Sequence, residues 1–236
     1  MSWLQHVFDT VILDWGPALL DGAAVTLQIS AGAFAVGLLI GVLVAMTKLS
    51  GPRPLVWLAN LYTSICRSVP ELLLILLLYY AGGDLINYLL AQFDQGPAPI
   101  NGFMAAVVVL GIVQGAYAGE IIRGAIQSIP PGHIEAARAF GCRRGLVLQR
   151  IILPEMLPYA LGGLSNLWLI LIKDSALISV VGYSELLFTT KQAAGSTREY
   201  LLFYVSVSVV YLLITLLSNL LFSRFDRRIG RWMPAH

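Results

Sequence analysis

The sequence predicts an all-α integral membrane protein with five transmembrane helices. Hydrophobic residues make up 58% of the 236 residues and charged residues only 12%, and the mean hydropathy is +0.78. This composition is more apolar than the core of a water-soluble domain requires. Five apolar segments are long enough for a helix to cross a bilayer, which takes roughly 20 residues. They lie at residues 20–47, 55–82, 102–124, 156–182 and 201–223, and we expect a single membrane domain over residues 1–236.

The basic residues predict how these helices are oriented. An odd number of spans places the two termini on opposite sides of the membrane. Eleven of the fifteen Lys and Arg residues fall on the side that holds the C-terminus, and basic loops are retained in the cytoplasm. We therefore expect the N-terminus outside and the C-terminus inside. The eleven residues are Lys48, Arg53, Arg123, Arg138, Arg143, Arg144, Arg150, Arg224, Arg227, Arg228 and Arg231.

Residues 1–18 carry apolar side chains at helical spacing, with polar side chains mostly between them. This pattern predicts an amphipathic helix on the outer, periplasmic side. Such a helix either lies on the membrane surface or packs against the protein itself, and the sequence leaves both arrangements open. The apolar positions are Leu4, Val7, Phe8, Val11, Ile12 and Trp15.

Small residues recur every four positions in the first and third spans. Gly37 and Gly41 lie in the first span, and Gly111, Gly115 and Gly119 lie in the third. Glycines at this spacing let two helix backbones approach closely in a membrane. The pattern predicts tight helix packing, either within the chain or at a subunit interface, and does not indicate a function.

Four charged residues lie inside apolar segments, where charge is expensive and usually marks a cavity or a partner. Arg67 and Glu71 lie in the second segment, and Lys173 and Asp174 in the fourth. Each carboxylate is about 17 residues from the cytoplasmic end of its segment, or roughly 25 Å along a helix, so the two could share one depth. Either they hold the cationic group of a basic substrate, or they are neutralised in fixed ion pairs, Glu71 by Arg67 and Asp174 by Lys173 or by a partner residue.

Residues 130–150, between the third and fourth spans, form a polar hairpin with strong helix boundary signals. Pro130 and Pro131 end the third helix and open a short helix at about 132–140, because proline suits a first helical turn and breaks the helix before it. Gly141 is expected to end this helix in the left-handed conformation. The hairpin is therefore predicted to be stiff and cytoplasmic.

The short helix presents small and charged residues. We expect Ala136 and Ala137 to let a partner surface approach closely, and Glu135 to cap the helix start or to pair with an arginine. Gly141 would allow close backbone contact with the partner. The alternative is an ordinary loop helix that lies at the membrane surface.

The hairpin resembles the signature of the membrane subunits of binding-protein-dependent ABC importers. That signature is Glu-Ala-Ala, three residues, Gly, nine residues and Ile-x-Leu-Pro. The matching residues are Glu135, Ala136, Ala137, Gly141, Ile151, Leu153 and Pro154.

Two further segments resemble the polar amino acid branch of this family, and the likeness is nearest to permeases of the histidine/arginine/octopine type. Arg67-Ser68-Val69-Pro70-Glu71 is similar to an Arg-Gly-Thr/Val-Pro element, with Ser68 in place of the usual glycine. Lys173-Asp174-Ser175-Ala176-Leu177 is similar to a Lys-Asp-Thr/Ser-Ser/Ala-Leu element. On this resemblance the candidates for substrate contact are Arg67, Ser68, Glu71 and Asp174.

The resemblance implies the type I ABC importer fold and a pore subunit for polar, here basic, amino acids or opines. Its short cytoplasmic helix would dock on an ATP-binding subunit, with Glu135, Ala136, Ala137 and Gly141 as the coupling residues. The implied partners are two ATP-binding subunits that hold ATP and Mg, a second permease and a periplasmic or extracellular binding protein. A heterodimer of permeases is favoured over a homodimer. The implied location is the bacterial cytoplasmic (inner) membrane.

The chain lacks the parts that other function classes require. No lysine follows a glycine, so there is no phosphate loop and we expect no cofactor in this chain. The three histidines are scattered without metal-ligand spacing, and no nucleophile turn of the Gly-x-Ser-x-Gly type occurs. Neither an enzyme nor a nucleic-acid partner is expected. A free-standing secondary carrier or channel would explain the spans and the buried charges, but not the hairpin.

Overall fold

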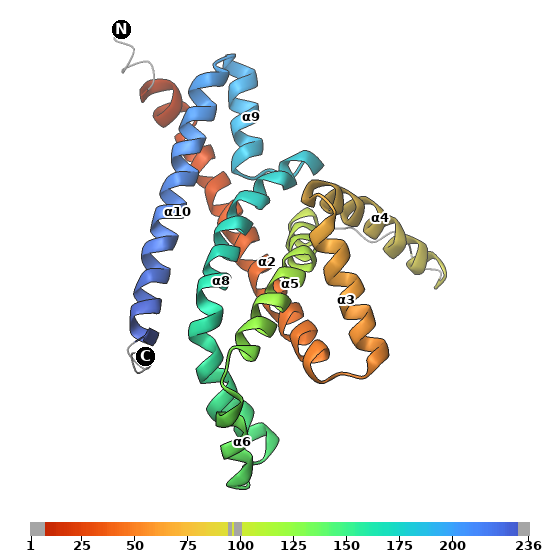
Figure 1. The fold of residues 1–236 in the computed structure, drawn as a ribbon. Helices are drawn as coiled ribbons and strands as arrows, with labels where there is room; N and C mark the ends of the chain where they lie inside the picture. Colours follow the sequence, from red (N-terminus) through yellow and green to blue (C-terminus); the bar gives the residue numbers. More distant parts are fainter. Residues whose placement is uncertain (1–7, 94–95, 97–100, 231–236) are drawn as a thin grey trace.

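The computed structural model of the chain is helical in the part that it describes, which comprises residues 8–93, 96 and 101–230 (Figure 1). The helices are η1 (Phe8–Asp14), α2 (Gly16–Ser50), α3 (Arg53–Ser68), α4 (Glu71–Ala91), α5 (Gly102–Gln127), α6 (Pro131–Ala139), α7 (Arg144–Val147), η2 (Leu148–Ile152), α8 (Leu153–Asp174), η3 (Ser175–Val181), α9 (Leu186–Thr197) and α10 (Tyr200–Gly230).

Five helical segments of this described part are long and apolar enough to cross a membrane, as the sequence predicts. They are α2, α4, α5, the continuous run from α7 to η3, and α10 up to Asp226. Figure 1 shows α6 at one end of the bundle and η1 at the other. The assignment of the η1 end to the outside stays a prediction.

The expected second span at residues 55–82 is wrong as a single helix. The helix is interrupted between α3, which ends at Ser68, and α4, which begins at Glu71. Pro70 explains the break, because proline lacks the N–H of a helical turn and forces its predecessor out of the helical region. Val69 accordingly has the extended angles φ −91° and ψ 138°.

The N-terminal segment packs in part on the protein itself. Residues 1–7 of the predicted amphipathic helix lie outside the described part; η1 ends at Asp14, and α2 begins at Gly16 rather than near residue 20. Val11 is buried in an apolar cluster, and the ring of Trp15 stands edge-on to Phe203 at a centroid distance of 6.2 Å. Ile12 and Leu13, in contrast, are more than half exposed.

The glycines of α2 and α5 allow the closest helix pair of the bundle, which confirms the predicted tight packing. A Cβ atom at Gly41 would lie 2.7 Å from Ala118 Cβ and 2.9 Å from the Gly119 amide nitrogen. A Cβ atom at Gly115 would lie 2.6 Å from Ile40 Cγ2. These separations are shorter than carbon atoms tolerate, so only glycine fits at this crossing.

Replacing Gly41 by alanine is expected to lower stability in detergent by about 1–3 kcal/mol, because the new methyl group forces the α5 backbone away. The midpoint of thermal unfolding measures the change. Gly124→Ala is the matched control, since a Cβ atom at Gly124 meets nothing within 4 Å. Equal midpoints for the two variants would contradict the packing argument.

A buried carboxylate holds three helices together at the η1 end of the bundle. Glu185 is fully buried and accepts hydrogen bonds from the amides of Leu187 and Phe188, which begin α9. The hydroxyls of Thr26 on α2 and Tyr211 on α10 each donate to its Oε2 at 3.3 Å. Burial raises the pKa of the Glu185 carboxyl above its ordinary value of 4.5, although these donors oppose the rise.

Replacing Glu185 by alanine should cost about 2–4 kcal/mol, because a helix cap is lost and buried donors are left unpaired. Replacement by glutamine should cost less and should change the pH dependence. Since the folded-state pKa is raised, the ionised carboxylate opposes folding at neutral pH, and stability rises as the pH falls through that pKa. As the pH is lowered from neutral towards the ordinary carboxyl value of 4.5, the unfolding midpoint should therefore rise more in the wild type than in Glu185→Gln. An equal rise in both would contradict this assignment.

Candidate functional site

Two helix boundaries position the charged residues predicted for substrate contact. Glu71 is the first residue of α4, where the partial positive charge of the helix N-terminus favours a carboxylate. Asp174 is the last residue of α8, directly before η3. Arg67 lies in the last turn of α3 and Ser68 ends that helix, and both side chains are exposed.

The structure brings Glu71 and Asp174 together. The two carboxyl groups lie close enough to interact electrostatically, and the Tyr117 hydroxyl likewise interacts with Glu71. Gln114 Nε2 donates to Asp174 Oδ2 at 2.9 Å. The two acidic residues thus form one site, although the helix-length count that placed them at a common depth assumed an unbroken second span.

Gln114 leaves one acceptor free at this site. Its side chain is 1% exposed, and its Oε1 has no hydrogen-bond partner within the described part of the chain. A buried acceptor without a partner is costly. A ligand with N–H donors could therefore be held by Gln114 together with the two carboxylates.

The alternative of two fixed ion pairs finds no support in the described residues. No ion pair within 4 Å joins Arg67 to Glu71 or Lys173 to Asp174. Arg67 and Glu71 stand on opposite sides of the break at Pro70, and the Lys173 side chain is exposed. The part of the chain that the structure describes therefore supplies no cation in direct contact with the two clustered carboxylates.

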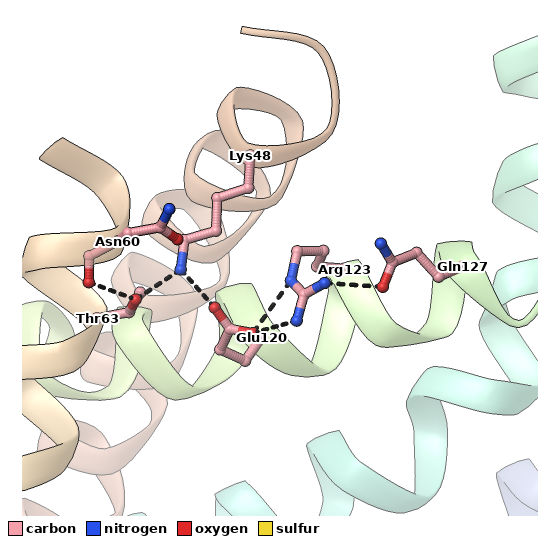
Figure 2. Close-up of polar contacts among 6 residues, drawn as sticks. All are labelled: Lys48, Asn60, Thr63, Glu120, Arg123 and Gln127. Carbon is pink, nitrogen blue, oxygen red and sulfur yellow. Dashed lines mark hydrogen bonds and ion pairs between the residues drawn. The ribbon is translucent and has the colours of Figure 1, made fainter. Parts of the chain in front are cut away.

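A polar cavity of about 670 Å³ lies between α2, α3 and α5. It extends from Arg67 toward the end of the bundle that carries α6. Glu120 is its central charge (Figure 2). Lys48 Nζ contacts Glu120 Oε1 at 2.5 Å and donates to Thr63 Oγ1 at 2.6 Å, while Arg123 Nη2 and Nε donate to Glu120 Oε2 at 2.7 and 3.1 Å. The lining residues include Lys48, Asn60, Thr63, Ser64, Arg67, Ser68, Glu120 and Arg123.

Sequence reasoning missed the polar positions of α5. Gln114, Tyr117, Glu120 and Arg123 recur every three residues within a span that is otherwise apolar. Successive residues at this spacing are neighbours on the helix surface, so together they form a polar stripe that winds around α5. The spacing, together with a carboxylate inside a span, could have indicated this stripe from the sequence.

The predicted hairpin helix is present as α6. Pro131 is its first residue, and Gly141 has the left-handed angle φ +78°, both as predicted. The amide of Cys142 donates to the Ala137 carbonyl and the amide of Gly141 donates to the Arg138 carbonyl, which is the Schellman arrangement that ends a helix.

The coupling residues differ in what they expose. Glu135 and Ala136 are exposed, but Ala137 is only 7% exposed and packs against its own chain, so its methyl group does not offer a surface to a partner. Glu135 lies in the second turn of α6, so it does not cap the helix start, and it makes no ion pair within the described part of the chain. Phe140, which follows α6, is 89% exposed.

Two contacts fasten α6 to the bundle. Ile134 packs on an apolar cluster formed by residues of α2, α5 and α8. His133 Nδ1 lies 2.7 Å from Glu155 Oε2, in the first turn of α8. A force on α6 therefore reaches α8 directly as well as through the intervening chain.

Comparison with known proteins identifies the family. The model of the "Binding-protein-dependent transport system inner membrane component" family matches residues 37–231. The chain belongs to this family.

Relatives and solved structures agree with this assignment. The nopaline transport system permease protein NocQ of Agrobacterium fabrum is 38% identical, over 94% of this chain and 98% of that protein. The histidine/lysine/arginine/ornithine transport system permease protein HisQ of Escherichia coli is 37% identical, over 89% and 92%. A crystal structure of an amino acid ABC transporter with histidines matches with a TM-score of 0.77 and 31% identity, over 92% of this chain and 96% of that one.

Membership of the inner membrane component family confirms the expected importer fold. A structure of the MetNI methionine ABC transporter, 22% identical, shares this fold with a TM-score of 0.68 over 97% of this chain and 99% of that one. The chain is a multi-pass membrane subunit of an ABC importer and not an enzyme, and its family implies ATPase partners and a binding protein.

Proposed function

We propose that this permease moves basic amino acids or opines across the bacterial cytoplasmic membrane, and that Glu71 and Asp174 hold the cationic group of the substrate. The observation that carries the proposal is the meeting of these two carboxylates, with no cation among the described residues in an ion pair with them within 4 Å. A guanidinium or ammonium group would satisfy both carboxylates, and would do so more strongly here than in water. The names of the relatives, which include nopaline and histidine/lysine/arginine/ornithine systems, support this substrate class.

The remaining polar groups suit the other end of an amino acid. Arg67 and Ser68 are exposed at the end of α3, a few residues before Glu71 in the chain, and a guanidinium pairs well with a carboxylate. The free Gln114 Oε1 would accept an N–H of the ligand. The site thus offers acidic and basic partners to a substrate that carries both charges.

Transport is driven through α6. In this proposal its exposed face, with Glu135, Ala136, Gly141 and the adjoining Phe140, docks on an ATP-binding subunit, and an exposed aromatic side chain is a typical interface anchor. The contacts of Ile134 and His133 then transmit the movement of that subunit to the bundle.

The assembly needs further chains. Two ATP-binding subunits supply ATP and Mg, and a binding protein delivers the substrate to the outer side. Five spans do not readily enclose a pore, so a second permease completes it, and we favour a related chain over a copy of this one. The N-terminus is outside and the C-terminus inside in this arrangement.

Affinity purification from native membranes, followed by reconstitution in liposomes, tests the proposal. The expected result is recovery of an ATPase and a second permease, with uptake of arginine or an opine that requires ATP and the binding protein. A lone chain that transports without ATP would instead show a secondary carrier. Uptake restricted to uncharged amino acids would refute the assigned role of Glu71 and Asp174.

A further inference from the structure

Shared lining residues relate the polar cavity beside Glu120 to the carboxylate site. A second cavity of about 150 Å³ shares Arg67 and Glu120 with it and is also lined by Tyr117, which interacts electrostatically with Glu71. Along α5, nine residues separate Gln114 from Arg123, a rise of roughly 14 Å. A stripe of polar residues that winds around α5 therefore leads from Asp174, the partner of Gln114, to the large cavity.

This cavity lies toward the α6 end of the bundle. Lys48 is in the last turn of α2, and Arg123 is four residues before the end of α5, which leads to α6. In the orientation proposed above, that end faces the cytoplasm. A substrate that leaves the carboxylate site for the cytoplasm would then pass Glu120.

An unpaired Glu120 would trap a cationic substrate on such a path, because a partly buried carboxylate binds a guanidinium strongly. Both of its oxygens are already occupied, Oε1 by Lys48 and Oε2 by Arg123. The cavity contains three cationic side chains and one carboxylate, a formal charge of +2. Its lining therefore disfavours the retention of a cation.

The two cations on Glu120 are not equivalent. The Lys48 side chain is 6% exposed and links α2, α3 and α5 through Thr63 and Glu120, so it is fixed within the fold. The Arg123 side chain is 33% exposed and lines the cavity, where it is also held by Gln127 at 2.7 Å. Its guanidinium is the same chemical group as that of an arginine-like substrate.

We propose that the large cavity is the cytoplasmic exit chamber of the translocation path, and that Arg123 competes internally with the substrate's guanidinium for Glu120. By occupying Oε2, Arg123 lets a basic substrate leave without being trapped and keeps cytoplasmic basic amino acids from binding there. This inference rests on the proposed function and adds Arg123 and Glu120 as residues that control release.

Inhibition by internal arginine tests the proposal. The reconstituted complex, with its ATPase and binding protein, is loaded with ATP and increasing arginine inside the liposomes, and the initial rate of ATP-dependent uptake is measured. Arg123→Gln should lower the half-inhibitory internal arginine concentration by at least about tenfold, the factor that one charged hydrogen bond supplies. Internal citrulline, which lacks the charge of arginine, should inhibit wild type and variant alike.

The double variant Arg123→Gln/Glu120→Gln identifies the carboxylate. It should return to wild-type sensitivity, because no carboxylate remains for the internal arginine to bind. Arg53→Gln removes an exposed positive charge at the start of α3, near the same end of the bundle but outside the cavity lining, and should leave the inhibition unchanged.

Equal sensitivity of wild type and Arg123→Gln would overturn the proposal, as would a double variant as sensitive as the single one. If Arg123→Gln does not assemble, Arg123→Lys replaces it, since one ammonium cannot reproduce the paired contact. Sensitivity unchanged by that substitution would count equally against the proposal. Failure of the wild type to take up any basic amino acid or opine would instead reject the proposed function.

Discussion

Replacing Glu71 by glutamine is expected to lower the kcat/KM of ATP-dependent arginine uptake by about 10- to 100-fold, the effect of losing one charged hydrogen bond in a poorly screened site. The side chain keeps its size and its place at the start of α4, so assembly with the partner subunits should be retained. Initial uptake rates in liposomes, compared at equal amounts of assembled complex, measure the change.

Asp174→Asn should give a loss of similar size, because its carboxyl group shares the site with Glu71. The fold-loss of kcat/KM in the double variant should be smaller than the product of the two single fold-losses, since neighbouring residues of one site are not independent. Asp84→Asn is the control, because Asp84 is an exposed carboxylate on the same helix α4. Uptake kinetics of Glu71→Gln equal to those of the wild type would contradict a role in substrate contact.

Local patterns explain why much of the fold could be predicted from the sequence. The five spans follow from runs of apolar residues, and the ends of α6 follow from Pro131 and Gly141, whose backbone preferences act over a single turn. The glycine spacing predicted close helix packing at Gly41, although it did not identify α5 as the partner helix. Each of these features depends on neighbours in the sequence.

The sequence-based predictions that proved wrong depend on features that local patterns do not register. Residues 55–82 are apolar enough to read as one span, but hydropathy does not register the backbone break that Pro70 imposes between α3 and α4. In α6, nine residues give too few turns to show which face packs inward, and Ala137 proved to be buried against its own chain.

The full set of residues that make up the polar sites could be identified only once the fold was known. Lys48 and Glu120 are 72 residues apart in the chain, and only the crossing of α2 and α5 brings them to 2.5 Å. Glu71 and Asp174 could be proposed as a pair from their charge and their place in apolar segments. Tyr117 and Gln114, which complete that site, come from a third helix whose register against α4 and α8 no local pattern specifies.

Replacing Gly141 by aspartate is expected to lower the recovery of the ATPase with the purified permease by at least about tenfold, the equivalent of one lost anchor of an interface. A Cβ atom at Gly141 meets nothing within 4 Å, and aspartate is among the residues that tolerate φ of +78°. The hairpin should therefore keep its fold, and the effect should come from a charged side chain placed where the ATPase approaches closely.

Two further substitutions separate the partner contact from the fold of the hairpin. Gly145→Asp adds the same charge to the exposed start of α7, where a Cβ atom also meets nothing within 4 Å, and should leave recovery of the ATPase unchanged. Gly141→Ala adds backbone strain of about 1–2 kcal/mol in the left-handed region but little bulk. Its loss of ATPase recovery should lie between that of the wild type and that of Gly141→Asp. If Gly141→Asp and Gly145→Asp reduce recovery equally, the effect is one of charge in the hairpin, and Gly141 has no specific docking role. Full recovery of the ATPase with Gly141→Asp would mean that docking takes place elsewhere on the permease.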